Sequence, residues 1–295
     1  MRFRRLLLCL LLAGFLLAGI TWLNNNWSIR PLSRAEFLGR LDNAMAASRQ
    51  WVLGVGDPNK FFTDEESSVL LRNPALMHMV ADCALISADQ RLQSLAAAYF
   101  RVNLKPYRWG RLVDPNCPFE RLPAGLLLRF DDYMRWFLHA VVPTEYPLTA
   151  EDRADMFSPD KYRTGSATHQ LLALHLYRKH NGSNPHLDWL IRHISMRIAS
   201  EASIDFRVTD LYLQRIAFLL VAGQQDLVKR RWVERALDAQ QPDGGWSYSW
   251  HGWQPKPYRF QFGEESTTSH PTVQGMWITY MLKYRYPKWI ENNYQ

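Results

Sequence analysis

The sequence predicts an all-α protein built from helical hairpins, and three observations support this prediction. Apolar residues recur with helical spacing through most of the chain, and no segment shows the alternation typical of a strand. Helices that are apolar on nearly all sides alternate with helices that carry one apolar stripe. The N-terminus carries a long apolar run behind three arginines. A helix that is apolar all round is buried and a striped helix is not, so the body should have inner and outer helices.

Residues 1–23 are expected to form a signal anchor. Three arginines precede an apolar run over 6–23, which is long enough to span a bilayer with little tilt. The basic flank predicts a cytoplasmic N-terminus and a body on the extracytoplasmic (periplasmic) side of the inner (plasma) membrane. A cleaved signal peptide is the alternative. The residues around Leu17–Ile20 form a poor cleavage site, which favours an uncleaved single-pass transmembrane helix.

The remaining chain is expected to form one domain, 33–295, joined to the anchor by a polar tether over 24–32. A capping box at Ser33–Glu36 predicts the start of the first helix. Asn73–Pro74 starts a second helix, because proline fits the first helical turn. Further helices are expected to begin near Gln90 and to cover 126–142.

The alternation of inner and outer helices is clearest in the second half of the chain. Three segments are apolar nearly all round: 168–177, 210–222 and 271–284. Two segments between them carry one apolar stripe: 187–198 and 227–239. In the last of these, Glu234 and Arg235 are expected on the solvent side. This order of helices predicts a double ring of hairpins, an α/α toroid that is either closed or incomplete.

The stretch from Gln240 to Trp246 reads Gln-Gln-Pro-Asp-Gly-Gly-Trp and joins two of these helices. Pro242 and the Gly244–Gly245 pair predict a turn. We expect the amide of Gln240 to cap the preceding helix and to pack on the Trp246 ring. An aromatic loop follows, and Ser269–Pro271 begins the next helix.

This stretch resembles the Gln-Trp motif of terpenoid cyclases and protein prenyltransferases, whose domains are α/α toroids. The resemblance covers mainly residues 200–286, and the matching residues are Arg235, Ala236, Gln240, Gly244 or Gly245, and Trp246. The resemblance implies an α/α-toroid fold but does not imply a particular activity, because one fold can carry several chemistries. Asp210 and His270 match two zinc ligands of the prenyltransferases, but Tyr212 stands where their cysteine ligand would be. The Asp-rich acid motif of the cyclases is absent from the sequence.

Three predicted inner helices begin alike, with a hydroxyl residue next to a titratable one. The pairs are Thr168–His169, Thr209–Asp210 and Ser269–His270. The starts of inner helices meet at one end of a toroid, so we expect a catalytic site formed by His169, Asp210 and His270, with Asp131 or Asp132 nearby. Two histidines and one aspartate suit general acid–base catalysis or a divalent metal such as zinc. The alternative is that these residues are ordinary helix caps.

Aromatic side chains crowd residues 246–262, after the turn. Aromatic rings can line sugar or prenyl pockets. We expect five of them to bind substrate: Trp246, Tyr248, Trp250, Trp253 and Phe262. The alternative is a hydrophobic plug that closes one end of the body.

The net charge argues against one class of function, nucleic-acid binding, and the cysteines leave two redox states open. The chain carries a net charge of +7, and part of this excess lies before the anchor. It has no lysine- and arginine-rich stripe with interleaved aromatics, which argues against nucleic-acid binding. Cys83 and Cys117 lie in the exported part and allow either one disulfide or two free thiols.

Two functions from different classes follow from these features. The first is a membrane-anchored enzyme of the cell envelope, held by residues 6–23, that acts on a lipid-linked or sugar-containing substrate at one end of the toroid. The second is a non-catalytic binding or scaffold module that uses the aromatic stretch 246–262 as a contact surface.

Overall fold

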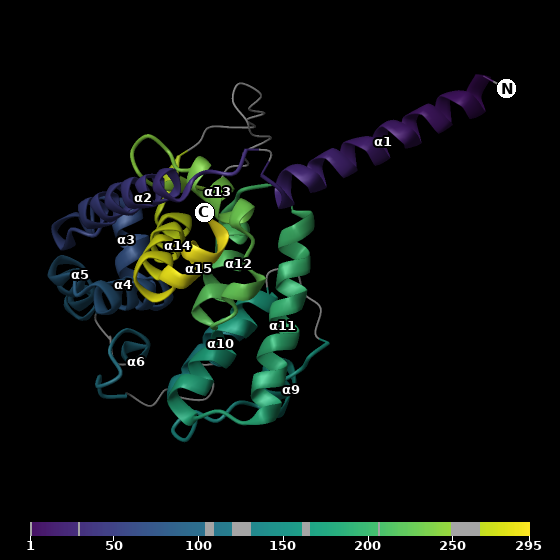
Figure 1. Ribbon diagram of the computed structural model, residues 1–295. Helices are drawn as coiled ribbons and strands as arrows, with labels where there is room; N and C mark the ends of the chain where they lie inside the picture. The colour runs from purple at the N-terminus through teal and green to yellow at the C-terminus, as the bar shows by residue number, and fades with distance from the viewer. Residues whose placement is uncertain are drawn as a thin grey trace.

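The computed structural model describes the following ranges: 2–28, 30–103, 109–119, 131–160, 166–205, 207–248 and 266–295. Within these ranges the structure is 74% helical, with 14 α-helices and almost no strand, so the all-α prediction is confirmed. Figure 1 shows the helices gathered into one body, from which the N-terminal helix projects.

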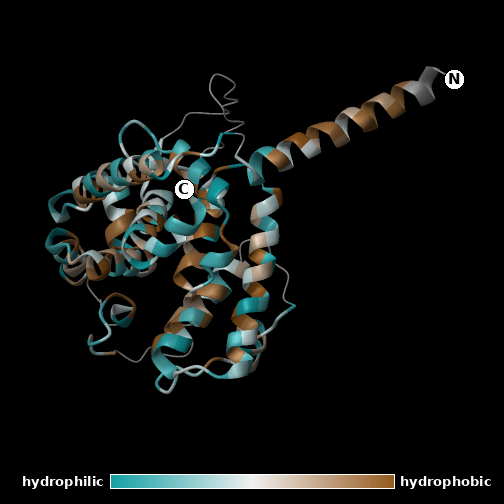
Figure 2. Cartoon of the chain, in the orientation of Figure 1, coloured by the Kyte–Doolittle hydropathy of each residue, from teal (hydrophilic) through white to brown (hydrophobic). Residues whose placement is uncertain are grey.

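The first helix, α1 (Arg2–Asn26), is apolar along most of its length (Figure 2). Its segment Leu6–Asn26 is long and apolar enough to cross a membrane, and none of its apolar window is buried against the body. This confirms a single apolar N-terminal helix within the described residues. A signal sequence has the same length and composition, so both interpretations of the segment remain compatible with it.

The first half of the body consists of short and medium helices with side-chain caps. α2 (Arg34–Val55) begins at the predicted capping box, where Glu36 N donates to Ser33 Oγ and Ser33 N donates to Glu36 Oε2. The helices that follow in this half are α3 (Glu65–Arg72), α4 (Pro74–Ser87), α5 (Gln90–Val102) and α6 (Gly110–Val113). The side chain of Asn73 accepts from two backbone N–H groups at the start of α4, as expected for an N-cap.

The second half contains eight helices: α8 (Asp132–Val141), α9 (Ala150–Met156), α10 (Ser166–Asn181), α11 (Pro185–Ile204), α12 (Asp210–Val221), α13 (Arg230–Asp238), α14 (Ser269–Tyr280) and α15 (Pro287–Asn293). A π-helical turn, Met281–Arg285, lies between the last two. The strands β1 (Trp246–Ser247) and β2 (Thr267–Thr268) pair in antiparallel fashion at the start of α14.

The two most central helices are α12 and α14. In α12 every residue from Tyr212 to Val221 is buried, and in α14 every residue except His270 is buried. α14 packs against α2, α4 and α12, whereas α10 packs against α8, α11 and α12. α11 buries only one face, through residues such as Leu187, Leu190 and Ile194. The predicted one-sided burial is therefore present in α11, but α13 is buried at every residue from Trp232 to Leu237.

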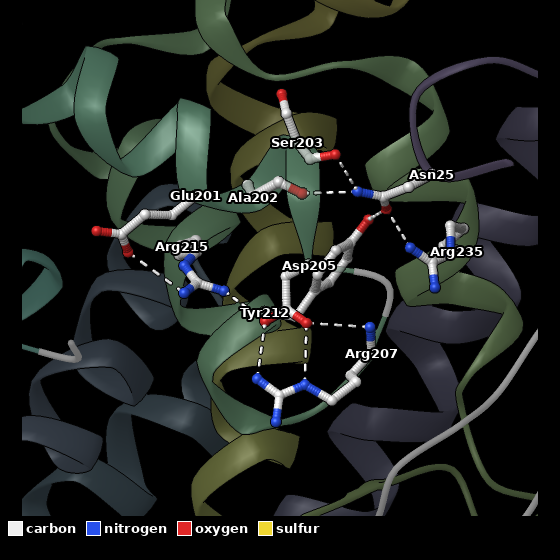
Figure 3. Close-up of polar contacts among 9 residues, drawn as sticks. All are labelled: Asn25, Glu201, Ala202, Ser203, Asp205, Arg207, Tyr212, Arg215 and Arg235. Atoms are coloured by element: carbon white, nitrogen blue, oxygen red, sulfur yellow. Dashed lines mark hydrogen bonds and ion pairs between the residues drawn. The ribbon is translucent and has the colours of Figure 1, made fainter. Parts of the chain in front are cut away.

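The outward orientation predicted for Glu234 and Arg235 is wrong, because both residues are buried, with exposed fractions of 2% and 1%. The end of α1 covers them. Arg235 Nη1 donates to Asn25 Oδ1, and Ser28 Oγ donates to Glu234 Oε2. Figure 3 shows Asn25 between Arg235 and the backbone of Ala202 and Ser203.

The predicted tether over 24–32 is also wrong at its start. Asn25 and Asn26 continue α1 and are buried, and Lys229 Nζ donates to Asn26 Oδ1 at 2.7 Å. Polar residues here satisfy polar groups of α11 and α13 instead of contacting water. The apolar helix is therefore built into the body at its C-terminal end.

The Gln240–Trp246 stretch forms the joint between α13 and α14. Gln240 Nε2 donates to the carbonyls of Ala44 at 2.9 Å and Gly244 at 2.7 Å, so its amide ties the turn to α2. Gly244 has φ +96°, and a Cβ there would lie 2.6 Å from the Ala47 carbonyl oxygen. Both conditions require glycine. Trp246 is 2% exposed and its Nε1 donates to the Ala236 carbonyl at 2.7 Å.

The structure decides between the two alternatives for the cysteines. Cys83 and Cys117 are both buried and both free. Burial raises the pKa of each thiol, most strongly that of Cys83, so both groups stay protonated near neutral pH.

Candidate functional site

Two of the three predicted catalytic residues contact each other. Asp210 is the first residue of α12 and His270 is the second residue of α14, and these helices pack side by side. His270 Nδ1 lies 2.5 Å from Asp210 Oδ1. The side chains are 24% and 20% exposed, so the pair is reachable from outside while most of its surface is covered.

His169, the third predicted residue, is held by side chains of α8 and α12. Its ring stacks on Tyr133 of α8, with centroids 4.3 Å apart and planes inclined by 22°. Gln214 Nε2 lies 3.4 Å from His169 Nε2, and Gln214 Oε1 accepts from Thr168 Oγ1 at 2.5 Å. Gln214 stands one helical turn after Asp210, so it connects His169 to the helix that carries Asp210.

Further residues complete the surroundings of His270. Tyr248 stacks on the His270 ring, with centroids 6.0 Å apart and planes inclined by 15°. Gln274, one turn along α14, places Nε2 3.2 Å from Nδ1. Glu66 of α3 holds the start of α14: its carboxylate accepts from Ser269 N at 2.5 Å and its carbonyl accepts from Ser269 Oγ at 2.8 Å.

Several of these residues were not predicted from the sequence. Gln214 and Gln274 follow Asp210 and His270 by four residues, so helical spacing alone identifies them as neighbours. Tyr133 and Glu66 come from other helices, and the sequence carries no signal that places them here.

The electrostatics of the site favour a protonated tyrosine. Burial raises the pKa of Tyr248, and the negative charges of Asp210 and Glu66 raise it further. The hydroxyl therefore stays protonated near neutral pH and can donate a hydrogen bond.

The geometry allows His270 to act as a base. In the neutral ring, an Nδ1–H that donates to Asp210 leaves Nε2 unprotonated as an acceptor. A carboxylate in this position fixes the tautomer and stabilises the imidazolium that forms when Nε2 takes a proton. Among the described residues, no group forms a hydrogen bond with Nε2.

The predicted zinc site is not supported by the described part of the chain, where no group of three His, Cys, Asp or Glu side chains could hold a metal ion. Asp210 binds the ring nitrogen of His270 directly. Asp132 forms an ion pair with Arg135 of its own helix at 2.7 Å, and Asp131 lies beside Tyr133.

The aromatic residues predicted to bind substrate divide into three groups. Trp246 is a core residue, as described above, and Tyr248 lies against His270. Trp250, Trp253 and Phe262 lie outside the described residues.

Buried histidines give the body a specific pH dependence. Burial lowers the pKa of His175 to about 3, whereas an unfolded histidine titrates near 6.5. Between these values the unfolded chain binds a proton that the folded protein does not. Stability should therefore fall as the pH is lowered from about 6.5 toward 3, by up to about 1.4 kcal/mol per pH unit for this residue. His78, whose pKa burial also lowers, adds to the same loss.

Urea unfolding at pH 7, 6 and 5 measures this dependence. His175→Gln should flatten the slope, whereas the same change at the exposed His186 should leave it as in the wild type. The pKa values of Asp82 and Asp205 are lowered, so the stability that they contribute is lost only below about pH 4 and outside this window. If the free energy of unfolding depended on pH equally in the wild type and in His175→Gln, His175 would not be the source of the pH dependence.

Comparison of the chain with protein-family models, curated proteins and solved structures gave no match.

Proposed function

We propose that the body is an α/α toroid anchored by α1 to the inner (plasma) membrane, with the body on the extracytoplasmic side. The burial of α12 and α14 on nearly all sides supports inner helices, and the one-sided burial of α11 supports an outer one. The glycine turn and the buried Trp246 at the joint between α13 and α14 support the resemblance to the Gln-Trp motif.

The function that the site supports best is general acid–base catalysis on an envelope substrate, lipid-linked or sugar-containing. The observation that carries this proposal is the 2.5 Å contact between His270 Nδ1 and Asp210 Oδ1, at partly exposed ends of two buried helices. His270 is the one residue of α14 that is not buried. A purely structural position in this helix would be filled at lower cost by an apolar residue.

In the proposed reaction, His270 Nε2 takes a proton from a water molecule, and the water oxygen bonds to the carbonyl, phosphorus or anomeric centre of the substrate. The bond from that centre to the leaving oxygen breaks, and the protonated His270 returns the proton to the leaving oxygen, so that the base is restored. Asp210 keeps the proton of Nδ1 in place and stabilises the positive charge that develops on the ring. The protonated Tyr248 hydroxyl is a hydrogen-bond donor for the oxygen that gains negative charge.

The replacement His270→Ala tests the proposal. Full-length protein in lipid nanodiscs would be assayed with chromogenic esters, phosphodiesters and glycosides and with a polyprenyl-phosphate-linked sugar. His270→Ala should lower turnover by about 10²–10⁴-fold, the usual contribution of a positioned acid–base group. His186→Ala, at an exposed histidine outside the site, should retain wild-type turnover.

A second measurement separates catalysis from a structural clamp between α12 and α14. Asp210→Asn should lower turnover and change the ¹⁵N shifts of the His270 ring, because the amide no longer fixes the Nδ1–H tautomer. The unfolding midpoint of this variant should change little. If the Asp210→Asn variant lost stability in proportion to its loss of activity, the catalytic role would be refuted. If the wild type turned over none of the substrates, the alternative function, a non-catalytic binding or scaffold module, would be favoured.

A further inference from the structure

A cavity in the body is lined by residues other than those around the Asp210–His270 pair. It has a volume of about 390 Å³ and lies between α4, α5, α6 and the C-terminal end of α10. Pockets for small ligands start at about 300 Å³, so the volume is sufficient for a small molecule. In Figure 1, α6 lies on the side of the body away from the point where α1 leaves it.

The walls of the cavity are mostly apolar. Four alanines of α4 and α5 line the apolar part of the cavity, which is called the slot below: Ala81, Ala84, Ala96 and Ala97. Phe100 and Leu112 line the slot further along. An open apolar slot of this kind accepts an alkyl chain, because filling it removes apolar surface from water.

The cavity is lined by two cations, Arg111 and Lys179, and two carboxylates, Asp82 and Asp114, which differ in how they are paired. Lys179, at the exposed end of α10, has no ion-pair partner among the described residues. Arg111 Nη1 lies 3.5 Å from a carboxylate oxygen of Glu145, which is a weak contact at a surface. The carboxylate of Asp82, by contrast, already accepts from Arg285 at 2.9 Å and from Trp277 at 2.7 Å.

The two histidines of the cavity do not add to its positive charge. Burial lowers the pKa of His180, and Lys179 and Arg111 lower it further. Burial also lowers the pKa of His78, whose Nδ1 lies 2.6 Å from the Leu112 carbonyl. Both rings are therefore neutral near pH 7, and Lys179 and Arg111 supply the cationic charge. Asp114 is the one carboxylate of the lining without an arginine partner, and its Oδ1 accepts from Asn116 N at 2.9 Å.

We propose that this cavity binds a single-chain carboxylate amphiphile, such as a medium-chain fatty acid. The carboxylate lies at the end lined by Arg111 and Lys179, and the alkyl chain occupies the alanine-lined slot. A free fatty acid is favoured over a bilayer phospholipid, because the cavity lies on the side away from α1 and its volume of about 390 Å³ suits a single alkyl chain. The proposal is independent of the role of His270.

Photolabelling with a fatty acid tests this assignment on the full-length protein in nanodiscs. The probe is a twelve-carbon fatty acid with a diazirine on its chain, and labelled peptides are located by mass spectrometry. We expect labels on the facing sides of α4 and α5, removed by excess dodecanoic acid. Dodecanol, which lacks the charge, should compete at least about tenfold less well, as expected for the loss of a charge-assisted hydrogen bond.

Two charge-matched variants complete the test. Lys179→Glu should lower the apparent affinity for dodecanoic acid about tenfold or more, and Lys179→Arg should restore it. Lys288→Glu makes the same change of net charge at an exposed lysine outside the cavity and should label like the wild type. Labelling of α4 and α5 that dodecanol removes as well as the acid does, or that Lys179→Glu leaves unchanged, would overturn the proposal. Labelling confined to α1 would assign the probe to the bilayer and would equally overturn it.

Discussion

Replacing Trp246 with alanine should lower the free energy of unfolding by about 3–5 kcal/mol, the usual loss when a large aromatic side chain leaves a core. The ring is 2% exposed and lies against Gly275, where a Cβ would come within 2.5 Å of the ring. The alanine variant would also remove the donor of the 2.7 Å hydrogen bond to the Ala236 carbonyl, which ties the joint to α13. The cavity and the loss of this buried hydrogen bond both act against folding.

Urea unfolding followed by circular dichroism measures the effect. Asp243→Asn in the same turn is the matched control. Its side chain accepts from Gly245 N at 3.1 Å and Thr267 Oγ1 at 2.8 Å, and an asparagine oxygen can accept both bonds. We expect that control to cost less than about 1 kcal/mol. Wild-type stability in the Trp246→Ala variant would show that the joint does not depend on this ring.

Features of the fold that depend on local sequence were predicted well. The capping box at Ser33 and the N-cap at Asn73 act through residues two or three positions away, so the sequence contains the whole interaction. The burial of α12 and α14 follows from their composition alone. The turn at Gly244 also follows from local chemistry, because positive φ favours glycine.

Features that depend on distant partners were not predicted. Arg235 lies 210 residues from Asn25 in the sequence, and periodicity assigned this arginine to the solvent side because α13 was considered alone. In the candidate site, the similar starts of α12 and α14 predict that Asp210 and His270 lie together, and the two side chains are in contact. The positions of Glu66 and Tyr133 depend on how α3 and α8 pack, which the pattern of a single helix does not determine.

The junction between α1 and the body leads to the second large expected effect. Asn25 is 1% exposed and makes four hydrogen bonds to the body. Its Nδ2 donates to the carbonyls of Ala202 at 2.7 Å and Ser203 at 2.9 Å, and its Oδ1 accepts from Tyr212 Oη at 3.1 Å and from Arg235. Asn25→Ala should lower the free energy of unfolding by about 2–5 kcal/mol, because it removes an acceptor from a buried guanidinium.

Two controls show whether the loss comes from this junction. Asn24→Ala removes one acceptor of the partly buried Arg231 and should cost less than about 1 kcal/mol. A chain that starts at residue 24 keeps Asn25 and Asn26 and should remain folded in solution, whereas a chain that starts at 29 lacks both and should show the loss expected for Asn25→Ala or more. Equal stability of the two truncated chains would mean that the end of α1 only rests on the body. The expected difference would mean instead that the hydrogen bonds of Asn25 and Asn26 join the apolar helix to the body and fix the direction of α1 relative to the Asp210–His270 pair.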